Sequence, residues 1–180
     1  SRTRPAILRK DFITSQYQIA EAAAAGADSL LLIVAVTPAP LLRSLIDFCR
    51  DTCDMEPLVE VHAAEELDVA LKAGARVIGV NNRNLHTMVV DMGTAERTAN
   101  MMRDRGLGFE HEGVGGGKEY ALCALSGMST AEDVERYRKA GLGMCLIGES
   151  LMRAADTKAA IEGLCLDPAA YARRQLEDGG

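Results

Sequence analysis

The stretch AGADSLLLIVAV (residues 25–36) decides the fold, because a helical segment ends at a glycine and a continuous apolar run follows at once. The same junction recurs in AGARVIGV (residues 73–80) and in AGLGMCLIGE (residues 140–149). Glycine suits the left-handed residue that closes a helix. An uninterrupted apolar run is typical of a strand that is buried on both faces of a parallel sheet. Three copies of this junction therefore predict a chain of βα units.

The size and composition indicate one globular domain with a real core. The chain has 180 residues, of which 48% are hydrophobic and 26% are charged, which is ordinary for a soluble protein. The net charge of −6 argues against nucleic acid as the main partner but allows an anionic small molecule. No apolar run approaches the length of about 20 residues that spans a membrane, and no secretory signal opens the chain. We therefore expect a cytoplasmic location and no membrane partner.

The cysteines and histidines do not form a metal-ligand pattern. The five cysteines are spread along the chain, and the three histidines are scattered as well. Cys123 and Cys145 lie inside apolar runs and are expected to be small buried hydrophobic residues. Cys49 and Cys53 are four residues apart on one helix face, but further ligands are lacking. We expect reduced thiols in a cytosolic protein and no metal site.

Six strand–helix units follow one another without a hairpin signal. The expected strands are residues 6–9, 29–36, 57–61, 76–80, 121–125 and 144–147, and the expected helices are residues 15–25, 41–52, 64–73, 93–105, 130–140, 150–154 and 157–164. The segment 106–118, rich in glycine and charge, is expected to be an exposed insertion. Right-handed crossovers would lay the strands side by side in order. Six such units fit either a Rossmann-like sheet or three quarters of an eight-stranded barrel.

Two charged residues at strand ends could carry acid–base chemistry. The carboxyl ends of parallel strands share one edge of a sheet, so Lys10 and Glu60 should meet there. A partly desolvated Lys10 can act as a general acid. The alternative is that Lys10 is an ordinary surface lysine that extends its ammonium to solvent. Glu60 interrupts a buried strand, and a buried carboxylate needs a partner. The pair is therefore either an acid and a base or a purely structural ion pair.

The same edge should carry groups suited to an anionic ligand. Asn81 can orient a hydroxyl or carboxylate of a ligand, but asparagine also stabilises turns. Arg83 offers a planar guanidinium suited to phosphate or carboxylate, and the alternative is that it is an ordinary surface charge. Ser126-Gly127 and Gly148-Glu149 both lie between a strand and a helix. Backbone N–H groups at two adjacent helix N-termini form a phosphate-binding cup, which lies after the last two strands in barrels. The alternative is a pair of ordinary βα turns.

Taken together, these segments resemble the indole-3-glycerol phosphate synthase family. The resemblance runs in order from about Pro5 to Leu164. The motifs that carry it are LRKDFI (8–13) with YQI (17–19), AGAD (25–28), LVEVH (58–62), IGVNNRNL (78–85), LSGM (125–128) and IGESLMRA (147–154). It implies a (β/α)8 barrel present in part, as strands 3–8, and a lyase of tryptophan biosynthesis that needs no cofactor.

The resemblance also implies roles for the residues at the strand ends. The family converts 1-(2-carboxyphenylamino)-1-deoxyribulose 5-phosphate, a phosphorylated small molecule, to indole-3-glycerol phosphate with release of carbon dioxide and water. Lys10 would protonate the substrate carbonyl, Glu60 would act in the proton transfers of dehydration, and Asn81 would position the substrate beside Arg83. The residues that would bind the phosphate, mostly through backbone N–H groups, are Ser126, Gly127, Gly148 and Glu149. Phe12 and Leu85 could flank the anthranilate ring or could simply pack in the core.

Two departures from the family pattern set the alternatives. Many bacterial members have Glu at the position of Leu125, whereas the fungal multidomain branch resembles this chain, which points to a longer multifunctional parent. The first two βα units are missing, and the start SRTRP without Met suggests a piece of a longer protein. We expect a synthase domain over residues 1–166 and a polar tail or linker over 167–180. A noncatalytic phosphate-binding remnant and another sugar-phosphate barrel isomerase are the alternatives.

Overall fold

The strands form one parallel sheet whose spatial order is the order of the sequence. The computed structural model describes residues 4–85, 87–108 and 120–164, so the expected tail and most of the glycine-rich insertion lie outside the described residues. The six strands are β1 (Leu8–Arg9), β2 (Ser29–Ile33), β3 (Leu58–Val61), β4 (Val77–Asn81), β5 (Ala121–Leu125) and β6 (Met144–Leu146). A Rossmann-like sheet would reverse its strand order at a switch point, so the sequential order excludes that alternative.

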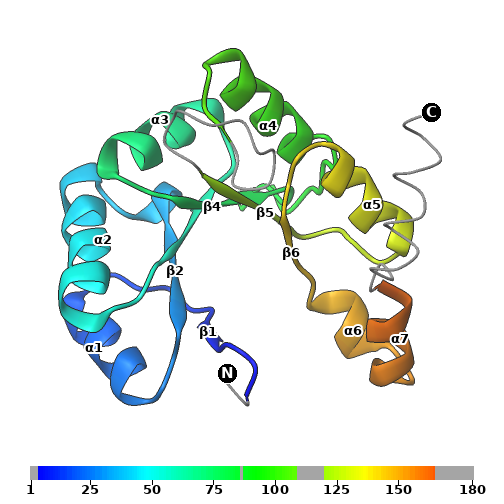
Figure 1. Cartoon of the computed structure of the whole chain (residues 1–180), viewed down its shortest axis with the longest axis horizontal. Helices are drawn as coiled ribbons and strands as arrows, with labels where there is room; N and C mark the ends of the chain where they lie inside the picture. Colours follow the sequence, from blue (N-terminus) through cyan, green and yellow to red (C-terminus); the bar gives the residue numbers. More distant parts are fainter. Residues whose placement is uncertain (1–3, 86, 109–119, 165–180) are drawn as a thin grey trace.

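Helices cover one face of this sheet. They are α1 (Gln16–Ala24), α2 (Ala39–Cys53), α3 (Ala64–Ala73), α4 (Thr94–Asp104), α5 (Ala131–Lys139), α6 (Glu149–Arg153) and α7 (Thr157–Leu164). Figure 1 shows the strands as an inner arc, with α1 to α5 along its outer side. Strands β1 and β6 form the two edges of the sheet.

The expected elements are confirmed, and the largest difference from the sequence prediction is at the end of β2. Residues Val34–Val36 form the 3₁₀ turn η1 instead of continuing β2. The ladder with β3 ends at Ile33, and the N–H of Thr37 donates to the carbonyl of Val34 at 3.1 Å. An apolar run predicts burial, and Val34 is indeed buried. Burial alone does not show whether a segment is a strand or a tight turn, and here the turn leads into Pro38 and helix α2.

The glycines of the repeated junction close helices as the sequence predicts. Gly26, Gly74 and Gly141 all have positive φ, at 88°, 93° and 88°. After α3, the N–H groups of Gly74 and Ala75 donate to the carbonyls of Leu71 and Ala70. These bonds satisfy the last carbonyls of the helix and turn the chain into β4.

Side chains alternate between two apolar layers on the faces of the sheet. The larger layer packs under the helices, and its strand residues include Leu30, Leu32, Val59, Val61, Ile78, Val80, Leu122 and Ala124. The smaller layer fills the inner side of the arc and contains Leu31, Ile33, Leu58, Cys123 and Leu125. Glu60 stands in register with Ile33 and with Gly79, so its carboxylate belongs to the inner layer.

Gly79 provides the space that two inner side chains fill. A Cβ at this position would lie 2.9 Å from Cδ1 of Leu125 and 3.2 Å from Cδ1 of Leu58. Both leucines are buried, and interiors packed this tightly resist added volume. The missing side chain on β4 therefore allows Leu125 to pack beside the strand end that carries Asn81.

Substitution Gly79→Val should destabilise the chain although valine favours strands. Overpacking against Leu58 and Leu125 should lower the free energy of unfolding by about 2 kcal/mol. Urea unfolding followed by circular dichroism measures the change. Gly163→Ala, at a helical glycine where a Cβ would meet nothing within 4 Å, should be neutral or stabilising. Equal or greater stability of Gly79→Val would contradict this account of the inner layer.

Candidate functional site

An ammonium and a buried carboxylate face each other at the carboxyl ends of β1 and β3. The Nζ atom of Lys10 lies 3.9 Å from Oε2 of Glu60. The Lys10 side chain is 49% exposed, whereas that of Glu60 is 3% exposed. Oε2 of Glu60 is buried and accepts no hydrogen bond within the described part of the chain. The ammonium is therefore the charged group that compensates this oxygen, and its exposed side remains accessible to a ligand.

Asn81 holds the other oxygen of the same carboxylate. Its Nδ2 donates to Oε1 of Glu60 at 2.8 Å, and its Oδ1 accepts from the N–H of Arg83 at 3.0 Å. Both contacts fix the orientation of the amide, which is nearly buried at 5% exposure. Asn81 thus links the carboxylate on β3 to the turn that carries Arg83.

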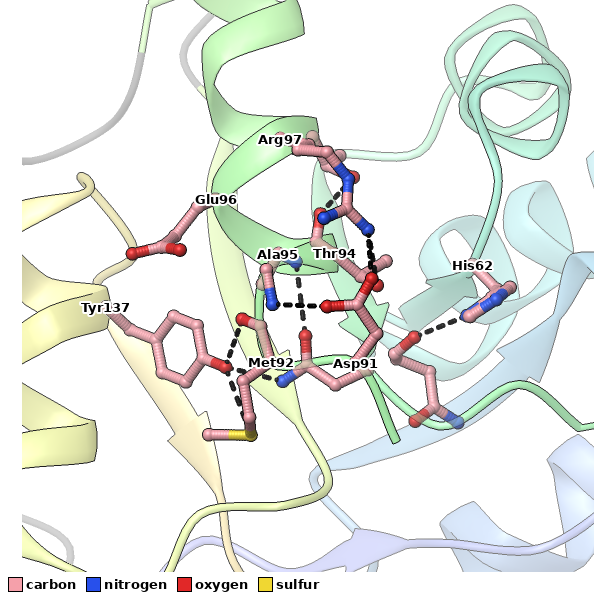
Figure 2. A network of polar contacts seen from close by, with 12 residues as sticks. His62, Asp91, Met92, Thr94, Ala95, Glu96, Arg97 and Tyr137 are labelled. Carbon is pink, nitrogen blue, oxygen red and sulfur yellow. Dashed lines mark hydrogen bonds and ion pairs between the residues drawn. The ribbon is translucent and has the colours of Figure 1, made fainter. Parts of the chain in front are cut away.

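His62 is a member of this cluster that the analysis of strand ends did not single out. Its Nδ1 lies 2.7 Å from the backbone carbonyl oxygen of Asn81, and its backbone N–H donates to Glu66. Figure 2 marks this contact of the His62 ring with a dashed line. A carbonyl oxygen only accepts, so Nδ1 carries the hydrogen. The signal in the sequence was its place two residues after Glu60, which puts it on the same strand end.

Arg83 is paired with a residue of the expected phosphate cup. Its Nη2 lies 3.0 Å from Oε2 of Glu149, and the other oxygen of Glu149 is 3.2 Å from Arg153. The side chain of Arg83 is 29% exposed and that of Glu149 is 61% exposed. An incoming anion would compete with the Glu149 carboxylate for the Arg83 guanidinium.

The two βα turns and the charged residues enclose one cavity of about 350 Å³. Its lining consists of Lys10, Arg83, Leu125, Ser126, Gly127, Met128, Leu146, Ile147, Gly148 and Glu149. Within the described residues, the backbone N–H groups of Gly127 and Gly148 donate to no acceptor. Free N–H groups in front of two helices are the donors that phosphate uses. The structure therefore brings the predicted anion groups and Lys10 to one cavity.

Phe12 and Leu85 do not pack in the core. Phe12 is 62% exposed and Leu85 is 36% exposed. Leu85 lines a small hollow beside Glu60 and His62. Ordinary core packing, the alternative left open by the sequence, is therefore wrong for both residues, and both are accessible to a ligand.

The sequence analysis also missed a buried polar pair behind the Ser126-Gly127 turn. Asn82 and Tyr137 are both fully buried, and Nδ2 of Asn82 donates to the Tyr137 hydroxyl at 2.8 Å. Asn82 has the same local setting as Asn81, but side chains alternate along the chain, so the two amides point to different layers. Only the fold brings Tyr137 of α5 to this place.

The cysteines of the described residues form no disulfide, and burial keeps three of them in the thiol form. Cys49, Cys53, Cys123 and Cys145 are all free. Burial raises the pKa of Cys49 and Cys123 to about 12 and that of Cys145 to about 11. In the part of the chain that the structure describes, no three His, Cys, Asp or Glu side chains gather as a metal would require, and no helix is long and apolar enough to cross a membrane.

Comparisons of sequence point to one family. A family model described as indole-3-glycerol phosphate synthase matches residues 2–164. The multifunctional tryptophan biosynthesis protein of Phanerodontia chrysosporium is 51% identical over 170 residues, which are 94% of this chain and 20% of that protein. Indole-3-glycerol phosphate synthase 2 of Streptomyces coelicolor is 44% identical over 158 residues, which are 88% of this chain and 55% of that protein. The chain therefore spans a fifth to about half of the length of these relatives.

A comparison of structures supports the same architecture. The crystal structure of 3-hexulose-6-phosphate synthase from Salmonella typhimurium has a TM-score of 0.67 at 16% identity, over 88% of this chain and 71% of that one. At this identity the likeness shows the fold alone. With the sequential parallel sheet, it identifies six consecutive units of a (β/α)8 barrel.

Replacing Glu149 by Gln should increase the affinity of the cavity for inorganic phosphate. The substitution removes the carboxylate that occupies Arg83, and a partly exposed ion pair of this kind is worth up to about 1 kcal/mol, or two- to fivefold in affinity. Titration of phosphate followed by amide shifts in NMR spectra measures the change. Glu162→Gln is the matched control, because Glu162 pairs with Lys158 on α7 at 3.8 Å. An equal increase in phosphate affinity in both variants would show that the effect comes from the change in net charge and not from release of Arg83.

Proposed function

The chain belongs to the indole-3-glycerol phosphate synthase family, and we propose that it supplies the acid–base pair and the phosphate site of that enzyme. The reaction closes the ring of 1-(2-carboxyphenylamino)-1-deoxyribulose 5-phosphate, with loss of carbon dioxide and water. The observation that carries the proposal is the position of Lys10 opposite Glu60 beside a cavity whose wall contains free backbone N–H groups. The enzyme is then a carbon–carbon lyase that acts without a cofactor.

Lys10 and Glu60 divide the proton transfers between them. As the aromatic carbon attacks the substrate carbonyl, the ammonium of Lys10 protonates the oxygen, which becomes a hydroxyl group. Loss of carbon dioxide restores the aromatic ring. Glu60 then takes part in the proton transfers that expel the hydroxyl group as water. The exposure of Lys10 and its position beside Glu60 support these roles, because a proton donor must exchange with solvent and an acid and a base must both reach the same substrate.

The remaining residues bind and orient the substrate. The N–H groups of Gly127 and Gly148, with neighbouring Ser126 and Glu149, hold the phosphate, and Arg83 adds a positive charge at the same cavity. Asn81 positions the substrate and holds Glu60. The exposed side chains of Phe12 and Leu85 flank the anthranilate ring.

We further propose that the chain works in the cytoplasm as one domain of a longer multifunctional protein. The support is the relation to the multifunctional protein of Phanerodontia chrysosporium, of which it matches 20%. Residues 1–166 would form the synthase part and residues 167–180 a connecting tail. Two further βα units would pair with the edges β1 and β6 and complete the barrel.

Lys10→Ala and Glu60→Gln should each lower kcat by on the order of a hundredfold, because each removes a positioned acid or base. The chain is joined to the segment that precedes the matching region in the Phanerodontia chrysosporium protein, and indole formation is followed by fluorescence. Gln at position 60 keeps an oxygen that can accept from Asn81, which limits the effect on folding.

The controls are Lys158→Ala and Glu162→Gln on α7, which should keep normal turnover. Near-normal turnover in both site variants would contradict the proposal. Phosphate binding without any ring closure in the completed chain would favour a noncatalytic remnant. Turnover of a sugar phosphate that survives Lys10→Ala would favour an isomerase.

A further inference from the structure

A buried asparagine connects the end of β4 to the turn after β5. The N–H of Asn82 donates to the carbonyl of Leu125 at 3.0 Å, and its Nδ2 donates to the carbonyl of Ser126 at 3.1 Å. Its Oδ1 accepts from the N–H of Ala95 at 3.1 Å, at the start of α4. Asn82 is 0% exposed, so no water substitutes for these partners.

Tyr137 completes this network from α5. Its hydroxyl accepts the second hydrogen of Asn82 Nδ2 and donates its own hydrogen to the carbonyl of Met92 at 2.7 Å (Figure 2). The ring is 0% exposed. Burial raises the pKa of Tyr137 to about 12, so the hydroxyl keeps its hydrogen at neutral pH. Every donor of this network therefore has a fixed acceptor.

The turn that the network holds is strained. Ser126 has a φ of +67°, which a residue with a side chain rarely adopts, and Gly127 follows with +88°. A Cβ at Gly127 would lie 2.5 Å from Sδ of Met92 and 2.8 Å from Cγ1 of Val90. Such a backbone persists where the surroundings over-determine it. Here the carbonyls of Leu125 and Ser126 are both held by Asn82, and Met92 closes the other side.

We propose that Asn82 and Tyr137 are positioning residues that fix the Ser126-Gly127 turn in its anion-binding form. The inference rests on the proposed function, which assigns phosphate to the N–H of Gly127. Ser126, Gly127 and Met128 line the cavity, whereas neither Asn82 nor Tyr137 does. The pair therefore acts on phosphate only through the turn, and its loss changes affinity without removing a ligand group.

The experiment uses inorganic phosphate and the ¹⁵N-labelled chain of 180 residues. In the unmutated chain, phosphate should shift the amides of Gly127 and Gly148. The side-chain amide of Asn82 should shift with the same dissociation constant, although it does not contact the ligand. Tyr137→Phe leaves one hydrogen of Asn82 and the carbonyl of Met92 without partners, and it should raise the dissociation constant about tenfold. The size of this effect should be the same at pH 6.5 and pH 8.5.

Ile46→Val on α2 is the control for stability. Ile46 is 0% exposed and packs in the layer under the helices, so its loss of a methyl group should lower the melting temperature without changing phosphate affinity. Tyr17→Phe, at a side chain that is 76% exposed, controls for the change of residue type.

The outcomes separate this inference from the proposed function. Phosphate binding of equal strength in Tyr137→Phe and the unmutated chain, or an Asn82 side-chain amide that does not respond, overturns the inference and leaves the proposed function in place. Absence of any shift at Gly127 and Gly148 overturns the proposed phosphate site itself. A tenfold loss confined to Tyr137→Phe supports both.

Discussion

A carboxylate buried on the inner side of a sheet must be compensated, and the compensation of Glu60 organises the whole edge where the strands end. A buried charge without partners would cost several kcal/mol or would be neutralised by a proton. Asn81 donates to one oxygen, and the ammonium of Lys10 approaches the other at 3.9 Å. The side-chain amide of Asn81 is in turn oriented by the backbone N–H of Arg83. The backbone carbonyl of Asn81 is contacted by Nδ1 of His62. One unfavourable burial thus fixes residues from β1, β3 and β4 relative to one another.

The fold supports this arrangement through the layer beneath it. Glu60 stands in register with Gly79, and Gly79 leaves space for Leu58 and Leu125. Leu125 closes the inner layer directly before the Ser126-Gly127 turn, so the packing of the inner side sets where the anion site begins. Because position 125 is a leucine, it adds no second carboxylate to the inner layer beside Glu60 within the described strands. The charged neighbour of Glu60 is therefore Lys10.

The sequence was sufficient to predict the six βα units and the residues at the strand ends, whereas the choice of a barrel over a Rossmann-like sheet rested on the family resemblance. Glycine at positions 26, 74 and 141 predicted left-handed helix ends, and the buried runs after them predicted strands, because both signals are local. The turn at Val34–Val36 was missed because apolarity reports burial and not backbone geometry. The pairing of Asn82 with Tyr137 could not be predicted, since the two residues are 55 positions apart and meet only through the packing of α5 on the sheet. The ion pair of Arg83 with Glu149 depends on the same long-range geometry.

The two halves of the site differ in how firmly the described chain holds them. The phosphate side lies between β5 and β6, where the buried Asn82 and Tyr137 form a hydrogen-bonded network with the carbonyl of Met92 behind the turn. The acid–base side depends on Lys10, which follows an edge strand of two residues and has a side chain that is 49% exposed. Additional strands paired with β1 would restrict this lysine far more than they would restrict the turn at Gly127. Anion affinity and turnover are therefore separable properties of this fold, because one depends on contacts buried within it and the other on how its open edge is covered.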